Sequence, residues 1–267
     1  GTAITTGDEN VAVGYAALTS NTLGRYSTAI GTSALRAQNY ASTTSAFNTA
    51  VGYDAGIAVT TGVNNTLIGG LAGDAITTAD NNTALGYNSL GLNTTGVANT
   101  AIGKDALDSN TTGNYNIALG ADSLQANTTG SQNVAIGRGT MDGNTTASNN
   151  TAVGYNALND NTTGTDNVAL GNLALDANTT ASSNTAIGSE SLTGNTTGTL
   201  NVGVGARALR SNTTANHNTA IGYKTLDVNT TGASNTALGS EALDANTTAS
   251  NNTAVGSSAL TANTTGT

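Results

Sequence analysis

A single glycine recurs at a fixed interval along almost the whole chain, in the frame N-[T/V]-A-[I/V/L]-G. The interval is 17 residues at every step except Gly31 to Gly52, where it is 21. The recurring glycines are Gly14, Gly31, Gly52, Gly69, Gly86, Gly103, Gly120, Gly137, Gly154, Gly171, Gly188, Gly205, Gly222, Gly239 and Gly256. A strict period of this length is typical of repeat proteins, in which each unit packs on neighbouring copies of itself. The sequence therefore predicts an array whose function depends on its shape and surface.

The composition permits only a thin apolar core. Aromatic residues make up 3% of the 267 residues and charged residues 9%, whereas there are 34 glycines and no proline, cysteine or tryptophan. Disorder is the alternative for a chain so rich in Asn, Thr and Gly, but disordered chains have no reason to keep aliphatic residues in strict phase. We therefore predict thin, repeated layers that each bury a few aliphatic side chains.

The charge balance excludes some partners. Sixteen acidic and seven basic residues give a net charge of −9, without runs of either sign. Binding to nucleic acid or to an anionic membrane surface depends on clustered Lys and Arg, so we expect neither. No apolar run approaches the roughly 20 residues of a membrane span, so membrane insertion is not expected either.

Within each unit, the residues before the glycine predict a short strand. Its side chains alternate, so the Thr/Val and Ile/Val/Leu positions share one face and the alanine lies on the other. Alanine is replaced only by Leu67 and Gly203, which indicates that its face is pressed against another surface. We expect the aliphatic face to be buried too, with the coil interior on one side and a second layer or a partner chain on the other. An invariant glycine indicates a positive φ or a very close backbone approach.

The second half of each unit predicts another buried position and a turn. A leucine follows the glycine by four residues, and Asn-Thr-Thr then supplies the turn. A helix is excluded because Gly, Asn and Thr interrupt every apolar stripe. Two short strands and two turns per unit predict an all-β fold, a parallel β-solenoid (β-roll) of about 15 coils. The two asparagines of each unit would then stack into two amide ladders.

The array covers residues 1–267 and is less regular at its start. Residues 1–81 hold irregular coils with an insertion near residues 36–47, and residues 82–267 hold regular coils. Glycine replaces the leucine at Gly56 and Gly73, and Val59 and Ile76 replace the ladder asparagine. Because loops on rigid scaffolds often bind partners, the insertion is a candidate recognition loop. The alternative, which we favour, is a bulge or packing defect. The candidate recognition residues are Arg36, Gln38, Tyr40 and Phe47.

The sequence offers no pattern for catalysis, cofactors or metals. Its glycines do not form a phosphate-binding motif with strand and helix context. Calcium-binding β-rolls need an aspartate in every turn, and here the turns carry Asn and Thr. A carbohydrate-active solenoid enzyme would need paired carboxylates in a cleft, and no unit carries a fixed acidic pair. We therefore expect a chain that is not an enzyme and has no cofactor, metal or catalytic residues.

The frame N-[TV]-A-[IV]-G-x-x-[AS]-L resembles two related sets of repeats. One is the head repeats of trimeric autotransporter adhesins, which have a shorter period. The other is the 17-residue NTAIGxxAL..NTTG arrays of phage tail fibres and bacterial surface fibres, which matches better. The resemblance implies a homotrimeric extracellular fibre on a cell surface or virion, with the alanine face at the trimer axis. It also implies contact with a host-surface receptor or glycan.

Two other functions fit the repeats. Stacked Thr rows resemble those of ice-binding solenoids, although these use two Thr columns on one face, whereas the strand here has one Thr. A monomeric solenoid could also polymerise end to end into an extracellular filament. The sequence thus predicts a structural or adhesive fibre segment first, with ice binding and filament formation as alternatives.

Overall fold

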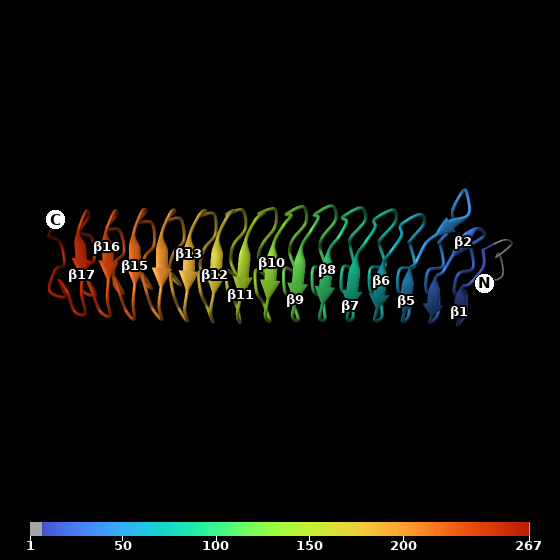
Figure 1. The fold of residues 1–267 in the computed structure, drawn as a ribbon, viewed down its shortest axis with the longest axis horizontal. Helices are drawn as coiled ribbons and strands as arrows, with labels where there is room; N and C mark the ends of the chain where they lie inside the picture. The colour runs from blue at the N-terminus through green and yellow to red at the C-terminus, as the bar shows by residue number, and fades with distance from the viewer. Residues whose placement is uncertain (1–6, 267) are drawn as a thin grey trace. The chain divides into compact units, whose positions relative to one another are not determined.

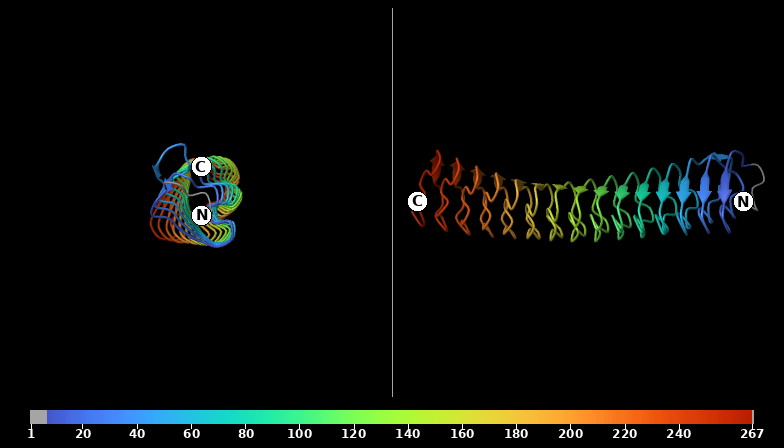
Figure 2. Two further views of the ribbon diagram at one scale, coloured as in Figure 1. Left: turned by 90° about the vertical axis from the view of Figure 1, so that its right-hand side faces the viewer. Right: turned by 90° about the horizontal axis from the view of Figure 1, so that it is seen from below.

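The computed structural model describes residues 7–266 and divides the chain into two units, Gly1–Gln132 and Asn133–Thr267. Each unit is a parallel β-solenoid, and together they contain about 14 turns of 17 residues, close to the 15 predicted. Residues 7–266 contain strands and turns but no helix. Within each unit, successive coils overlie one another (Figures 1 and 2). The predicted all-β solenoid is confirmed.

Each coil contributes one three-residue strand to a parallel, in-register ladder. Ala12 pairs with Ala29, which pairs with Ala50, and the same register continues in both units. In the first unit the strands are β1 (Val11–Val13), β3 (Thr28–Ile30), β5 (Thr49–Val51), β6 (Thr66–Ile68), β7 (Thr83–Leu85), β8 (Thr100–Ile102) and β9 (Ile117–Leu119). In the second they are β10 (Val134–Ile136), β11 (Thr151–Val153), β12 (Val168–Leu170), β13 (Thr185–Ile187), β14 (Val202–Val204), β15 (Thr219–Ile221), β16 (Thr236–Leu238) and β17 (Thr253–Val255).

The prediction of two strands per coil is wrong. The segment around the buried leucine is a series of turns, and the leucine itself is left-handed, as at Leu107 with φ of 53°. A residue with positive φ cannot continue an extended strand. Outside the main ladder, the described residues form one further sheet, a parallel pair of β2 (Gly24–Arg25) and β4 (Thr44–Ser45) beside the insertion. The segment that leads to β4 extends beyond the neighbouring coils in Figure 1.

The recurring glycine meets both conditions that its invariance predicts. Its φ lies between +129° and +146° at all 15 positions, a region that side chains rarely adopt. In addition, a Cβ on Gly103 would lie 2.5 Å from the carbonyl oxygen of Gly120 in the next coil. Any other residue would separate the coils.

The two predicted asparagine ladders are confirmed, with different bonding. In the turn ladder, Nδ2 of Asn110 donates to Oδ1 of Asn93 at 2.8 Å, rung to rung. In the ladder before the strand, Oδ1 of Asn82 accepts from the backbone N–H of Asn99 at 3.0 Å. Nδ2 of Asn99 then donates to the Gly113 carbonyl at 2.8 Å. All these amides are fully buried, so the ladders satisfy polar groups that the thin core would otherwise leave unpaired.

The alanine of each strand faces the interior of its own coil. Ala29, Ala101 and Ala186 are completely buried within a single chain, as are the leucines such as Leu107. The expectation that the alanine face would lie at a trimer axis is therefore wrong, because this face is already covered by the chain's own second layer. The aliphatic side chains of the strand point outward instead.

The departure from alanine at Leu67 is matched by two further departures nearby, whereas the one at Gly203 lies against a serine of the ordinary repeat frame. Around Leu67, a Cβ at Gly56 would lie 2.6 Å from Leu67 Cδ1, and a Cβ at Gly73 would lie 2.8 Å from Leu67 Cδ2. At Gly203, a Cβ would lie 2.6 Å from the hydroxyl of Ser191. Leu67 occupies the space that its two glycines leave empty, and the Ser191 hydroxyl lies beside Gly203. Serine at this position does not require glycine, because Ser89 and Ser123 lie opposite Ala101 and Ala135 and donate to the carbonyls of Gly86 and Gly120.

Candidate functional site

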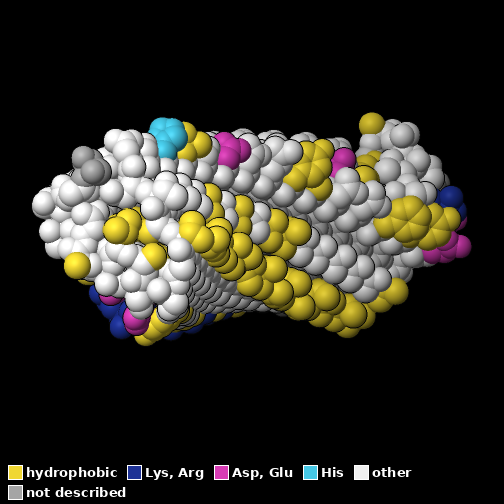
Figure 3. Space-filling model, turned by 60° about the vertical axis from the view of Figure 1, so that its left-hand side comes forward, with side chains coloured by type: hydrophobic (Ala, Val, Ile, Leu, Met, Phe, Trp, Pro, Cys, Tyr) yellow, Lys and Arg dark blue, Asp and Glu magenta, His cyan; other side chains and the backbone are white. Residues whose placement is uncertain are grey.

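The outer face of the strands is the most extensive apolar surface in each unit. Both flanking positions of each strand point outward, so they share one face, as predicted. The aliphatic column is only half covered, with exposed fractions of 39% at Ile30, 45% at Leu85 and 45% at Leu238. Figure 3 shows the hydrophobic side chains gathered in rows over the strands. In the first unit this outer aliphatic column consists of Val13, Ile30, Val51, Ile68, Leu85, Ile102 and Leu119.

Two of the four candidate recognition residues belong to the interior. Gln38 is fully buried and continues the turn ladder, since its Nε2 donates to Oδ1 of Asn21 at 3.5 Å. Its Oε1 also accepts from Asn48 Nδ2, in the other ladder, at 3.0 Å. Tyr40 is 6% exposed, and its hydroxyl donates to the Gly62 carbonyl at 2.9 Å. Burial raises the pKa of Tyr40 to about 12. Their side chains close the coil around the insertion and are not presented to a ligand.

The other two candidates, Arg36 and Phe47, lie on the surface but in different places. Phe47 stacks on Tyr26 of the preceding coil, with ring centroids 5.1 Å apart and planes 7° apart. The Arg25 guanidinium covers Tyr26 at 5.6 Å from the ring centroid and is ion-paired with Asp8. Arg36 is exposed and lies on a different turn, near Tyr53, where its positive charge acts to lower the pKa of the tyrosine. The structure therefore does not bring the four residues into one site.

A row of exposed tyrosines is a feature that our sequence analysis missed. Tyr15, Tyr53 and Tyr87 directly follow the recurring glycine in alternate coils, and they are 82%, 60% and 55% exposed. They lie in one column of the first unit, beside the outer aliphatic column. The signal in the sequence was present: aligning the repeats on their glycine places a tyrosine after every second one at the start of the chain.

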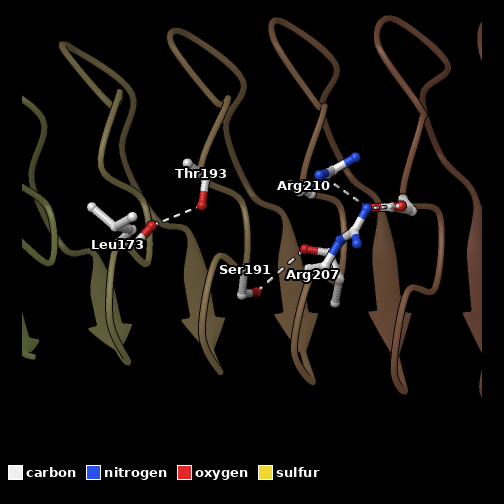
Figure 4. Close-up of polar contacts among 7 residues, drawn as sticks. Leu173, Ser191, Thr193, Arg207 and Arg210 are labelled. Carbon is white, nitrogen blue, oxygen red and sulfur yellow. Dashed lines mark hydrogen bonds and ion pairs between the residues drawn. The ribbon is translucent and has the colours of Figure 1, made fainter.

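The charged residues form local ion pairs. Arg207 and Arg210 converge on the carboxylate of Asp227, at 2.9 Å and 3.0 Å (Figure 4). The aspartates of one turn column, Asp74, Asp108 and Asp176, have raised pKa values chiefly because burial disfavours their charged form. Within residues 7–266 no group of three or more His, Cys, Asp or Glu is arranged to hold a metal ion.

The Asn-Thr-Thr turns are formal acceptors for N-linked glycans, but the fold hides the acceptor. The asparagine of each regular turn from Asn93 to Asn246 is fully buried and donates within the ladder, as Asn110 does. The first threonine is half-buried and donates to the next coil, with Thr94 Oγ1 3.0 Å from the Thr111 carbonyl. The second threonine of each turn is exposed, as at Thr112. A glycan on the turn asparagine is therefore incompatible with the stacked coils.

Comparisons with protein-family models, curated proteins and solved structures find no match for this chain. The resemblance to fibre repeats therefore stays a prediction from the residues of the repeat frame. Among residues 7–266, no helix is long and apolar enough to cross a membrane. The geometry of the outer surface thus carries the functional argument.

Proposed function

We propose that this chain is a structural and adhesive segment of an extracellular fibre, in which copies associate through the outer face of their strands. The observation that carries the proposal is the outer aliphatic column, which is regular and partly exposed in both units. Soluble monomers rarely expose a large continuous apolar patch, and such patches typically mark interfaces. The column is therefore better explained as a surface that binds a partner than as a surface that stays exposed to water.

A second copy of the chain is the partner that matches the column in spacing. Neighbouring strands in a sheet lie about 4.8 Å apart, so the column presents one aliphatic group at every such step. A parallel copy presents the same groups at the same interval, which lets the two columns interdigitate along their length. The homotrimer implied by the resemblance would bury three such columns together, and cyclic symmetry closes that assembly.

The test is the mass of the protein in solution. We expect light scattering to give three times the single-chain mass of 26.1 kDa. The double variant Leu85→Asp and Ile102→Asp places two charges on the outer face and should give a monomer, because burying unpaired charges is costly. The matched control Thr112→Asp, at an exposed turn, should keep the wild-type mass.

Other masses separate the alternatives. A wild-type mass of 26.1 kDa would contradict self-association. A broad distribution of long filaments that persists in the double variant would favour end-to-end polymerisation instead. Circular dichroism of each variant, compared with wild type, establishes that the coils are intact.

Ice binding is a second candidate, favoured by one column of the first unit. Its outer face carries five consecutive stacked threonines, which lie in register beside the outer aliphatic column. They are Thr28, Thr49, Thr66, Thr83 and Thr100. A flat array of hydroxyl and methyl groups could order water on this face. Thermal hysteresis of the purified chain tests the idea, and a zero value removes it.

A further inference from the structure

The tyrosine row of the first unit forms one straight column of turns. The backbone N–H of Ser33 donates to the Tyr15 carbonyl, and each following coil repeats this bond one step further along. The successive acceptors are the carbonyls of Tyr15, Thr32, Tyr53, Gly70 and Tyr87. Tyrosine therefore occupies every second position of this column.

The interval between the tyrosines is set by the stack of coils. Tyr26 and Phe47, which lie one coil apart in another column, stack at 5.1 Å between ring centroids. Residues two coils apart are separated by about 9.6 Å, twice the spacing of neighbouring strands. Among the described residues, Tyr26–Phe47 is the only stacked ring pair. The tyrosines of the row therefore do not stack on one another.

Small residues separate the tyrosines. Thr32 stands between Tyr15 and Tyr53, and Gly70 stands between Tyr53 and Tyr87. A Cβ on Gly70 would lie 3.7 Å from Cδ2 of Tyr87, so the Tyr87 ring lies over this glycine. The column therefore presents rings at a regular interval with no bulky side chain between them.

Paired charges flank the row. Asp54 hydrogen-bonds the Tyr53 hydroxyl and raises its pKa, whereas the nearby Arg36 charge acts in the opposite direction. Beside Tyr87, Asp105 is ion-paired with Lys104 and accepts from Asn88 Nδ2 at 3.0 Å. These groups offer hydrogen-bond donors and acceptors, without the cluster of positive charge that an anionic polysaccharide would need.

We propose that the tyrosine row binds an uncharged, extended β-1,4-linked polysaccharide. In such a chain successive sugar rings alternate in orientation, so the same ring face recurs once per disaccharide. The two-coil interval of about 9.6 Å is close to the length of that disaccharide. Three tyrosines then stack on every second sugar, and the flanking carboxylates, amide and guanidinium hydrogen-bond the sugar hydroxyls. Tyrosine suits this role because it combines a large apolar ring with a polar end.

This inference deepens the adhesive part of the proposed function by naming its ligand class, and it does not require self-association. A single chain carries the whole row, since all three tyrosines belong to the first unit. Failure of the mass test would therefore leave the binding test interpretable, and the reverse also holds.

The experiment measures binding of the whole chain to insoluble cellulose and chitin, and to cellohexaose and chitohexaose in solution. We expect binding to at least one of these glycans. Each Tyr→Ala change at positions 15, 53 and 87 should weaken it about tenfold, as expected for a tyrosine at the centre of an interface. Tyr155→Ala is the matched control, because Tyr155 also follows a recurring glycine but has no tyrosine two coils away. Its binding should equal that of wild type.

A spacing variant separates the row from a general effect of exposed tyrosines. Exchanging two residues, Thr32→Tyr with Tyr53→Thr, keeps three tyrosines but moves one by a single coil. We expect this variant to lose binding as Tyr53→Ala does. The proposal is overturned if wild type binds none of the four glycans, or if the exchanged variant binds as tightly as wild type. A change of mass in the triple Tyr→Ala variant would also overturn it, by assigning the row to an interface between copies.

Discussion

The coils around Leu67 and those around Gly203 break the same alanine column in opposite directions. In the first unit, leucine replaces alanine and fills the space left by glycines at positions 56 and 73. In the second unit, glycine replaces alanine and makes room for the Ser191 hydroxyl, which donates to the Gly203 carbonyl at 3.0 Å. One site adds volume to the strand layer, and the other removes it. At Leu67 the opposite layer of the coil changes by a compensating amount, whereas at Gly203 it keeps a serine that other coils combine with alanine, as at Ser89 and Ala101.

The comparison shows that the coils around Leu67 conserve the volume of their interior rather than the identity of each position. Protein interiors are close-packed, so one extra or missing methylene group is felt. Around Leu67 the turn-ladder asparagine is also replaced, by Val59 and Ile76, whereas the buried Asn65 and Asn82 keep the ladder before the strand. Around Gly203 the ladder asparagines are retained, and the added polar group is the serine hydroxyl. The same backbone therefore accepts an apolar or a polar residue at the turn-ladder position.

The largest expected effect is at the apolar site. Gly73→Leu restores the consensus leucine but should lower the free energy of unfolding by roughly 2–3 kcal/mol, because its side chain overlaps Leu67 and Ile76. The backbone does not oppose the change, since Gly73 has φ of 57° and consensus leucines such as Leu107 have φ of 53°. Urea unfolding followed by circular dichroism measures the loss.

A double-mutant cycle isolates the pairing at this site. Leu67→Ala alone leaves a cavity and should cost about 2–5 kcal/mol. Combined with Gly73→Leu, it should recover most of both losses, because the new leucine fills the cavity. Losses that simply add would show that the two positions do not share one space.

A smaller effect is expected at the polar site. Gly203→Ala should cost at most about 1.5 kcal/mol. The new methyl group would lie 2.6 Å from the Ser191 hydroxyl, which must then turn away from the Gly203 carbonyl, as the hydroxyls of Ser89 and Ser123 do opposite alanine. Adding Ser191→Ala should remove the cost, since Ala174 and Ala186 occupy the equivalent positions one coil earlier and are both buried. Unfolding in urea would again decide, and an unchanged loss in the double variant would contradict the pairing.

The fold could be predicted because its main determinants repeat in the sequence. The glycine period gives the length of a coil, and the in-register stack then places Asn82, Asn99 and Asn116 in one ladder. The left-handed leucine could not be predicted, since positive φ is uncommon for residues other than glycine, Asn and Asp. One signal did exist, because Gly56 and Gly73 stand at leucine positions and glycine adopts this conformation readily.

The candidate site could be predicted only in part. The insertion was found by its length, but length does not show which side chains turn inward. Gln38 lies seven residues after its recurring glycine, as the ladder asparagines do, and this spacing could have assigned it to the interior. The burial of Tyr40 depends on how four extra residues close the coil, which no repeat elsewhere in the chain displays. The sequence shows that the aliphatic and alanine positions lie on opposite faces of the strand, but not which face is inside. The aliphatic column could be assigned to the outer face only after the alanine was found to face inward.

The insertion gives a third departure, and the smallest expected effect. Here a single tyrosine, Tyr40, adds its hydroxyl to the buried polar network by donating to Gly62 and accepting from Asn48 Nδ2 at 3.3 Å. Tyr40→Phe should cost about 1 kcal/mol at neutral pH, the net value of a typical hydrogen bond. A cost near zero would show that, unlike the paired changes at Leu67, this network has no need of its added group.

The pH dependence of the stability of Tyr40→Phe tests the role of the buried hydroxyl more sharply. The pKa of Tyr40 is about 12 in the folded chain, above its ordinary value of 10.0, because burial disfavours the phenolate. The neutral hydroxyl therefore stabilises the fold fully below about pH 10, and this contribution is lost as the pH rises toward 12. Tyr40→Phe should lose less stability than wild type over that interval, whereas Tyr115→Phe, whose ring is exposed, should follow wild type. Urea midpoints measured across the interval test this, and parallel losses in wild type and Tyr40→Phe would show that the buried hydroxyl does not titrate with unfolding.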